Sequence, residues 1–272
     1  MKIITFLNHK GGVGKTTFAY TSAAGLAALG YRVVMVDADG QGSATLACGL
    51  AKTHGFYDFA VRNARFSDVL QVVDPKRYCP QVFPEHVTRR EGGFLWCIPG
   101  NVETMNIDPM MSIRTMRDRL RDLREDVDVV IIDTSPTPSK LHGGIYMATD
   151  YIIHPTEAEL LANDGLLESI VYREESNSQR LDWGIREIEV LGIIVNKFRS
   201  NTIVHTENYA KIGQKFGNLV WPPVTLSTMW PEAQNVKEPV FKYAPRSMAA
   251  QDAWMIVSKI AEVLNGTARQ AE

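Results

Sequence analysis

The segment with the most specific chemistry is a glycine-rich run that carries two lysines, HKGGVGKTT at residues 9–17. Glycines let backbone N–H groups point at phosphate oxygens, and a helix that begins at such a run adds its partial positive charge. In this arrangement Lys15 reaches the β- and γ-phosphates, and the Thr16 hydroxyl is a ligand for Mg²⁺. We therefore predict a loop that binds a nucleotide and Mg²⁺ through Gly11, Gly12, Val13, Gly14, Lys15, Thr16 and Thr17.

Two elements must position this loop. A β-branched run at residues 2–7 precedes it, and an apolar, alanine-rich stretch at residues 16–29 follows it. This strand–loop–helix order separates a phosphate loop from an ordinary tight turn. Lys10, the second lysine, has two interpretations. It is either a solvated charge beside an anionic site, or a group that contacts phosphate on its own subunit or across an interface.

Carboxylates follow two further apolar strands. Asp37 and Asp39 come after residues 33–36, and Asp133 ends the run at residues 129–132. Ligands of open α/β sheets bind at this carboxyl edge, and carboxylate oxygens suit Mg²⁺. A polar turn is the simpler interpretation of each aspartate taken alone. Together with the loop, they predict a metal site to which Thr16 and Asp133 contribute, with Lys15 and Asp39 beside it.

An asparagine ends another strand. Asn196 follows the apolar run 190–195, and its amide can both donate and accept hydrogen bonds, as the edge of adenine requires. A turn residue is an equally good explanation. The turn HPTE at residues 154–157 is a weaker candidate for the same neighbourhood. We therefore treat Asn196 as a candidate contact to the base.

Residues 10–17 resemble the deviant Walker A loop of the ParA/MinD ATPases, whose pattern is K-G-G-x-G-K-T-T. The run DADGQ at 37–41 resembles the switch I signature D-x-D-P-Q, and DTSP at 133–136 resembles switch II. The resemblance implies that ATP joins two subunits into a homodimer in which Lys10 reaches the partner's nucleotide. It also implies that Asp39 polarises the attacking water and that Asp37 supports the Mg²⁺ shell. The catalytic residues that it implies are Lys10, Lys15 and Asp39.

The chain departs from the family pattern at two switch positions. Gly40 stands where switch I usually has proline, and glycine makes the nucleotide-free loop more mobile. Ser135 replaces a proline in switch II. Neither change removes a carboxylate, so the roles that the resemblance implies for the aspartates are unaffected.

Residues 236–250 resemble the G-K-P-V…Y-x-P-x-S-x-A-A tail of ParA partition ATPases, and no helix-turn-helix precedes the loop. This resemblance implies a slow ATPase that a ParB-like protein stimulates and that partitions plasmid or chromosomal DNA or positions another cargo. Residues 196–246 hold seven Lys and Arg against three Glu, a local charge of +4 in a chain of net charge −2. A solvated helix face is one explanation of this charge, and non-specific DNA binding is the other. The candidate DNA-binding residues are Arg199, Lys211, Lys215, Lys237, Lys242 and Arg246.

Two other outputs remain open. A MinD-like protein would associate with a membrane through a basic amphipathic C-terminal helix. Here the apolar positions within residues 256–264 are more simply a stripe that faces the core, and the last residues lack a Lys/Arg cluster. We therefore expect no stable membrane association. A nucleotide-dependent adaptor, which recruits a protein without binding DNA, would need the same loop and switches.

Composition narrows the class and the compartment. The chain has 272 residues, 45% of them hydrophobic and 22% charged, and no apolar run approaches the ~20 residues of a membrane span. Its start shows no basic-then-apolar signal segment. Three cysteines form no C-x-x-C pair, which argues against a disulfide framework and against the iron–sulfur relatives of this ATPase class. We expect a cytoplasmic, nucleoid-associated protein.

Apolar strands alternate with amphipathic helices along the chain, which predicts an α/β fold with a doubly wound, mostly parallel sheet. We expect a single P-loop ATPase domain over residues 1–272, with an irregular elaboration at about 51–92. The predicted strands are 2–8, 31–37, 93–98, 127–133, 150–154, 188–195 and 219–226. The predicted helices are 15–29, 110–125, 158–178, 203–217 and 247–265, with shorter ones at 66–73, 140–148 and 231–236.

Overall fold

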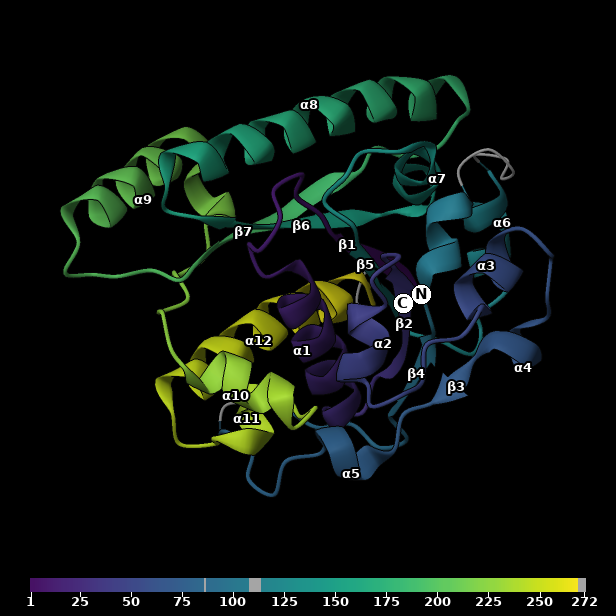
Figure 1. Cartoon of the computed structure of the whole chain (residues 1–272), viewed down its shortest axis with the longest axis horizontal. Coiled ribbons are helices and arrows are strands. Elements are labelled where there is room, and N and C mark those ends of the chain that lie inside the picture. Colours follow the sequence, from purple (N-terminus) through teal and green to yellow (C-terminus); the bar gives the residue numbers. More distant parts are fainter. Residues whose placement is uncertain (86, 108–113, 269–272) are drawn as a thin grey trace.

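The computed structural model describes residues 1–85, 87–107 and 114–268, which form a seven-stranded sheet flanked by helices (Figure 1). The strand order is β3-β4-β2-β5-β1-β6-β7, and neighbours run parallel except for the antiparallel pair β3–β4. The predicted doubly wound, mostly parallel α/β architecture is therefore confirmed. The strands are β1 Lys2–Phe6, β2 Arg32–Ala38, β3 Gln71–Val72, β4 Phe94–Ile98, β5 Val129–Thr134, β6 Tyr151–Glu157 and β7 Glu189–Asn196.

The central strands bring three chain segments to one edge of the sheet. All six residues of β5 are buried, which explains its almost continuous apolar sequence. β5 pairs Asp133 with Phe6 of β1 on one side and with Asp37 of β2 on the other. The loop that follows β1 therefore begins beside Asp133, with Asp37 one strand further along the same edge.

Helices cover the two faces of the sheet in separate layers (Figure 1). Ile4 and Met35 belong to the core under the first layer, and Val34 and Ile132 to the core under the second. The first layer contains α1 Lys15–Ala28, α2 Ser43–Ala47, α5 Pro75–Tyr78, α10 Met229–Asn235, α11 Val240–Tyr243 and α12 Met248–Ala268. The second contains α3 Gly55–Ala60, α4 Phe66–Val69, α6 Thr115–Arg121, α7 Lys140–Ala148, α8 Leu160–Asp182 and α9 Ile203–Phe216.

Helix α1, which carries the predicted phosphate loop at its start, is held by close packing against α12. Most of its side chains are buried, because it lies between the sheet and α12. The two helices approach most tightly at Gly25, where an added Cβ would lie well under 3.0 Å from the Val257 side chain. A glycine inside a helix costs about 1 kcal/mol relative to alanine. Here it permits the contact that fixes α1 in place.

Two predicted elements need comment. The predicted strand at 219–226 is wrong: Val220 and Thr225 form isolated bridges with Ile193 and Phe198 and no continuous ladder. The reason is the pair Pro222-Pro223, since proline has no N–H to donate to a neighbouring strand. Of the helix predicted at 110–125, the structure describes α6, and residues 110–113 lie outside the described residues.

The irregular segment 51–92 packs against both helix layers: α3 and α4 join the second layer, and α5 joins the first. Phe56 and Phe59 of α3 are fully buried in the same cluster as Val34 of β2. Arg119 of α6 stacks over the Phe59 ring, 4.4 Å from its centroid, and donates to the backbone carbonyls of Phe59 and Ala64. These contacts fix the elaboration against the sheet. The short helix predicted at 66–73 is present as α4, but it ends at Val69, and Gln71–Val72 form β3 instead. The helices α3 and α5 were not predicted, because runs of four to six residues carry no readable periodicity.

Short 3₁₀ turns complete the described chain: η1 is Val102–Asn106 and η2 is Gly217–Leu219. Asn101 caps η1 by accepting from the Glu103 N–H at 3.0 Å. Throughout the part of the chain that is described, no helix has the length and apolar character needed to cross a membrane.

Candidate nucleotide-binding site

The predicted phosphate loop lies between β1 and α1. Gly12 and Gly14 have φ angles of +77° and +104°, which L side chains rarely adopt. Gly14 directly precedes α1, so the unpaired N–H groups at the helix start face the loop. A Cβ at Gly14 would also lie 2.6 Å from the Asn196 side-chain nitrogen. Both backbone conformation and space therefore require glycine at this position.

Lys15 is the buried cation of the loop. Its side chain folds back so that Nζ donates to the Lys10 carbonyl at 3.0 Å, and the residue is 7% exposed. Burial lowers the pKa of Lys15, while the carboxylates of Asp133 and Asp39 act in the opposite direction. A poorly hydrated ammonium of this kind interacts strongly with an anion that enters the loop.

The Thr16–Asp133 pair provides oxygen ligands suited to Mg²⁺. The Thr16 hydroxyl donates to Asp133 Oδ2 at 2.7 Å. Asp133 is fully buried, and its Oδ1 has no hydrogen-bond partner among the described residues. Burial, followed by the neighbouring charge of Asp37, raises the pKa of Asp133 well above its ordinary value. A bound cation would neutralise the buried charge of Asp133 and give its free oxygen a partner. Mg²⁺ suits this position, because it is usually held by one or two carboxylates together with substrate phosphates.

Asp37 is fully buried and holds the start of the switch I segment. Its Oδ2 accepts from the backbone N–H and the hydroxyl of Thr45, at 2.7 and 2.6 Å. Its Oδ1 accepts from the Asp39 N–H at 3.3 Å, and the Thr45 hydroxyl in turn accepts from the Gly100 N–H. Burial raises the pKa of Asp37, and the Thr45 bonds oppose that rise. The geometry gives Asp37 a positioning task, and its contact with a metal stays a prediction.

Asp39 lies in the loop that leaves β2 and lines a cavity of about 360 Å³ between the two switch segments. Its carboxylate accepts from the Gln41 N–H at 2.9 Å. Met105 and Ser135 line the same cavity. A Cβ at Gly40 would lie well under 3.0 Å from the side chain of Met105, which is exposed and would have to move.

Asn196 braces the phosphate loop from β7. Its side-chain nitrogen donates to the Val13 carbonyl at 3.0 Å. A cavity of about 290 Å³ lies beside it, and its lining includes Thr17, Trp230 and Gln234. Gln234 donates to the Thr17 hydroxyl at 2.6 Å, and the Trp230 indole N–H has no partner among the described residues. Contact of Asn196 with a base stays a prediction. No local signal in the sequence marks Trp230 or Gln234, because they come from α10, far along the chain.

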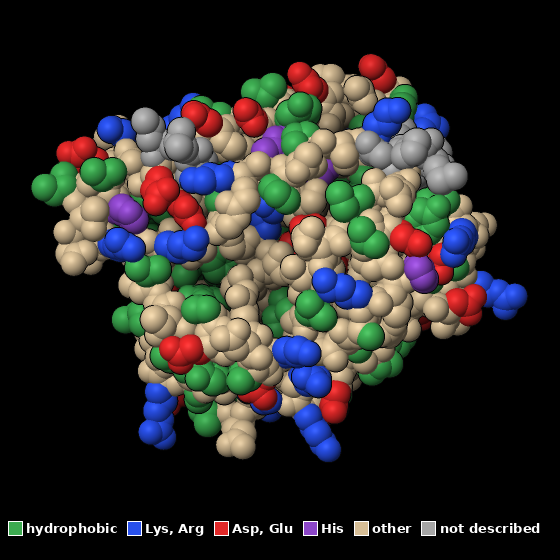
Figure 2. Space-filling model, viewed as in Figure 1, with side chains coloured by type: hydrophobic (Ala, Val, Ile, Leu, Met, Phe, Trp, Pro, Cys, Tyr) green, Lys and Arg blue, Asp and Glu red, His purple; other side chains and the backbone are tan. Residues whose placement is uncertain are grey.

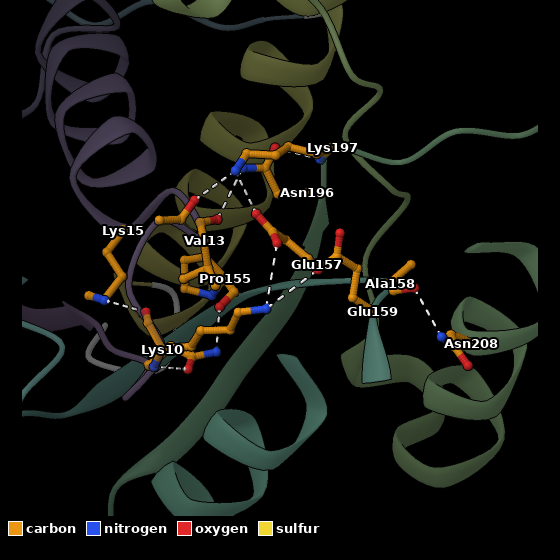
Figure 3. Close-up of polar contacts among 12 residues, drawn as sticks. Lys10, Val13, Lys15, Pro155, Glu157, Ala158, Glu159, Asn196, Lys197 and Asn208 are labelled. Carbon is orange, nitrogen blue, oxygen red and sulfur yellow. Dashed lines mark hydrogen bonds and ion pairs between the residues drawn. The ribbon is translucent and has the colours of Figure 1, made fainter. Parts of the chain in front are cut away.

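Lys10 points away from the interior of the loop toward the end of β6 (Figure 3). Its Nζ lies 3.8 Å from Glu157 Oε2 and 3.6 Å from Glu159 Oε2. Asn8 supports this arrangement by accepting from the Lys10 N–H at 2.8 Å and donating to the Pro155 carbonyl at 2.7 Å. Within one subunit, the second lysine is therefore paired with carboxylates, and its crossing to a partner stays a prediction.

The six candidate DNA-binding residues fall into two groups. The first lies on or before α9 and the second on the segment from α10 to the start of α12, and these helices belong to opposite layers (Figure 1). Most of the six are exposed, but Lys242 is partly buried and ion-paired with Glu238. On the face seen in Figure 2, basic and acidic side chains are interspersed. The first group is Arg199, Lys211 and Lys215, and the second is Lys237, Lys242 and Arg246.

A glycine loop with a buried lysine, followed by a helix and flanked by strand-end aspartates, defines a P-loop nucleotide-binding protein of the α/β class. A family model described as an AAA domain matches residues 1–182, well over half of the chain. With its two-lysine loop, the chain belongs to the ParA/MinD family of deviant Walker A ATPases.

Named relatives lie within this family. The chromosome-partitioning ATPase Soj of Thermus thermophilus is 28% identical over 249 residues, which covers 91% of this chain and 90% of Soj. Among solved structures, apo McdA of Cyanothece superposes with a TM-score of 0.78 at 19% identity, covering 97% of this chain and 99% of McdA. MinD of Pyrococcus horikoshii, solved with Mg-ADP, superposes with a TM-score of 0.72 at 17% identity and covers 96% of each chain. At such identities the two structures demonstrate a shared fold.

Proposed function

We propose that this chain is an ATP-dependent dimerising switch that binds non-specific DNA and hydrolyses ATP when a ParB-like protein stimulates it. Its task would be to partition DNA or to position another cargo. The observation that carries this proposal is that the side chains of two lysines in one loop point in different directions. Lys15 is buried inside the loop, whereas Lys10 points outward to carboxylates that an anion could replace.

The binding step follows from the loop. Its N–H groups and the Lys15 ammonium would surround the phosphates of ATP, and the Asn196 and Gln234 contacts hold the loop in shape. Thr16 and Asp133 would hold Mg²⁺, which supplies positive charge that neutralises phosphate oxygens. Asn196 and the neighbouring cavity are the proposed site of the adenine.

The chemical step would be the transfer of the γ-phosphoryl group to water, which gives ADP and phosphate. Asp39 would accept a hydrogen bond from the water and orient its oxygen toward the phosphorus, while the bond to the leaving ADP oxygen breaks. Lys15 would neutralise the charge that develops on the transferred group. Asp37 would act indirectly, because its bonds to Thr45 and to the Asp39 N–H position the switch I loop.

The dimer would form around ATP. Lys10 would leave Glu157 and Glu159 and contact the nucleotide of the second subunit, so that ATP contributes to the interface. Family membership and the likeness to Soj support the proposed task in DNA partition, because Soj carries the name of a chromosome-partitioning ATPase. A cytoplasmic, nucleoid-associated location follows from DNA binding.

DNA binding would use the exposed members of the two basic groups. We expect fluorescence anisotropy with a duplex of arbitrary sequence to show binding that requires ATP and weakens with salt, by a slope of about −0.9 per phosphate contacted. Replacing Lys211 and Lys215 together by alanine, or Lys237 and Arg246 together, should each reduce that slope by roughly 1–2. If the wild-type chain binds no DNA at low salt, or binds it equally without ATP, a MinD-like protein or an adaptor explains the switch better.

A further inference from the structure

A third lysine lies at the phosphate loop, although it is distant in sequence. Lys197 follows Asn196 at the end of β7, and its backbone is left-handed, with a φ of 52°. Its side chain extends back across the loop (Figure 3), where Nζ donates to the Gly12 carbonyl at 3.0 Å and lies 2.6 Å from Glu157 Oε1. The Lys197 ammonium therefore sits between the backbone of the loop and a carboxylate.

Glu157 is a shared counter-ion. Its side chain is 11% exposed, and its two oxygens face two ammonium groups: Oε1 faces Lys197 and Oε2 faces Lys10. Asn208 of α9 donates to the Ala158 carbonyl at 3.0 Å and so fixes the backbone next to it. A buried carboxylate is stable when it is paired, and here its partners are the lysines that border the phosphate loop.

Nucleotide phosphates would compete for these lysines. They bring several negative charges to a place where Glu157 at present balances two positive ones. Lys197 has three N–H donors, so it can keep the Gly12 carbonyl while it exchanges Glu157 for a phosphate oxygen. Its side chain is 50% exposed, which leaves the ammonium free to move by the small distance that this exchange needs.

We propose that Lys197 is a further phosphate-binding residue of this site and that Glu157 is the internal counter-ion that competes with the phosphates for it. The proposal rests on the nucleotide binding in the proposed function. It adds a third cation, supplied by β7, to the two lysines of the loop. It also assigns to Glu157 the task of setting nucleotide affinity, since any phosphate must first displace the carboxylate.

The test is a fluorescence titration of the full chain with labelled ATP and with competing ATP, ADP and AMP. Lys197→Gln should weaken ATP binding about 10-fold, because it removes one charge-assisted hydrogen bond to phosphate, part of whose strength is already offset by the loss of Glu157 as a partner. The loss should be much smaller for AMP. Lys76→Gln, which removes an exposed lysine of α5, is the matched charge control and should bind ATP as the wild type does.

Glu157→Gln tests the counter-ion. It should tighten ATP binding several-fold, and this gain should shrink in the double variant with Lys197→Gln. If Glu157 had only a structural role, Glu157→Gln would weaken ATP binding, or would change it equally in the wild type and in Lys197→Gln. Unchanged ATP affinity in Lys197→Gln, or an equal loss for AMP and ATP, would overturn the proposal while nucleotide binding itself stands. If the wild type does not bind ATP, or Lys15→Ala binds it equally well, the proposed function fails instead.

Discussion

Replacing Asp133 with asparagine should stabilise the nucleotide-free protein while it removes the ATPase activity. The carboxylate is fully buried, faces Asp37 across the β2–β5 pair and has one oxygen without a partner among the described residues. An unsatisfied buried polar atom costs about 1–3 kcal/mol, and a charged one costs more. Asparagine keeps the acceptor for the Thr16 hydroxyl, and its Nδ2 replaces the unpartnered oxygen without gaining a partner. The gain therefore comes from removing the buried charge and its repulsion by Asp37. We expect a gain of about 1–3 kcal/mol, or a rise in Tm of roughly 2–6 °C for a chain of this size.

The raised pKa of Asp133 also predicts how the stability of the folded protein changes with pH. The folded-state pKa of Asp133 is raised, so the carboxyl ionises in the unfolded chain, near pH ~4, before it ionises in the folded one. The wild-type protein should therefore lose stability as the pH rises from about 4 toward that raised pKa. In Asp133→Asn, stability should fall less over this pH range. Part of the fall should remain, because burial also raises the pKa of Asp37.

The assay is urea unfolding at several pH values, with EDTA and without nucleotide. Asp128→Asn is the matched control: Asp128 lies next to the start of β5, and although burial raises its pKa, the hydrogen bonds from Arg32 outweigh that effect and lower it. This control should destabilise the protein. If Asp133→Asn destabilises it as well, Asp133 is not an unfavourable buried charge and the argument for a cation at Thr16 and Asp133 is refuted.

Three further substitutions test the packing and the loop. Gly25→Ala should cost about 1–3 kcal/mol in urea unfolding through its clash with Val257, and Val257→Ala should recover part of it in a double-mutant cycle. Additive effects would contradict the contact. Arg119→Lys should cost about 1–2 kcal/mol and speed hydrogen exchange over residues 55–66, because lysine cannot reproduce the two-carbonyl fork over Phe59. Unchanged hydrogen exchange over residues 55–66 would show that the two Arg119 hydrogen bonds do not hold this segment in place. Lys15→Ala should weaken ATP binding at least ~100-fold by calorimetry, while circular dichroism stays native; a milder loss would mean that the loop amides bind the phosphates without it.

The sequence predicts well where one segment contains the whole signal. The loop at 9–17 is contiguous, and the central strands are buried on both faces, so their apolar runs are readable without knowledge of their neighbours. The strand predicted at 219–226 was wrong because its apolar residues surround two prolines, which interrupt any hydrogen-bond ladder.

The pairings around the loop could not be read from the sequence. Gln234 reaches Thr17 from α10, and Lys197 reaches Gly12 from β7. Each is a single polar residue whose partner is about two hundred positions away, and nothing in its local pattern distinguishes it from an ordinary surface residue. The turn predicted at residues 154–157 is wrong, because these residues pair with β7 as the end of β6. The pairing of Glu157 with lysines appears when the ends of β6 and β7 lie beside β1.

The most direct test of the ATP-dependent switch is the molar mass of the protein in solution, measured by light scattering on a sizing column. Asp39→Ala, which should bind ATP without hydrolysing it, is expected to be a dimer with ATP and a monomer with ADP or without nucleotide. Adding Lys10→Ala should keep ATP binding and abolish the dimer. A monomer of Asp39→Ala at saturating ATP, or a dimer that persists without Lys10, would contradict the proposal that ATP joins two subunits through this lysine.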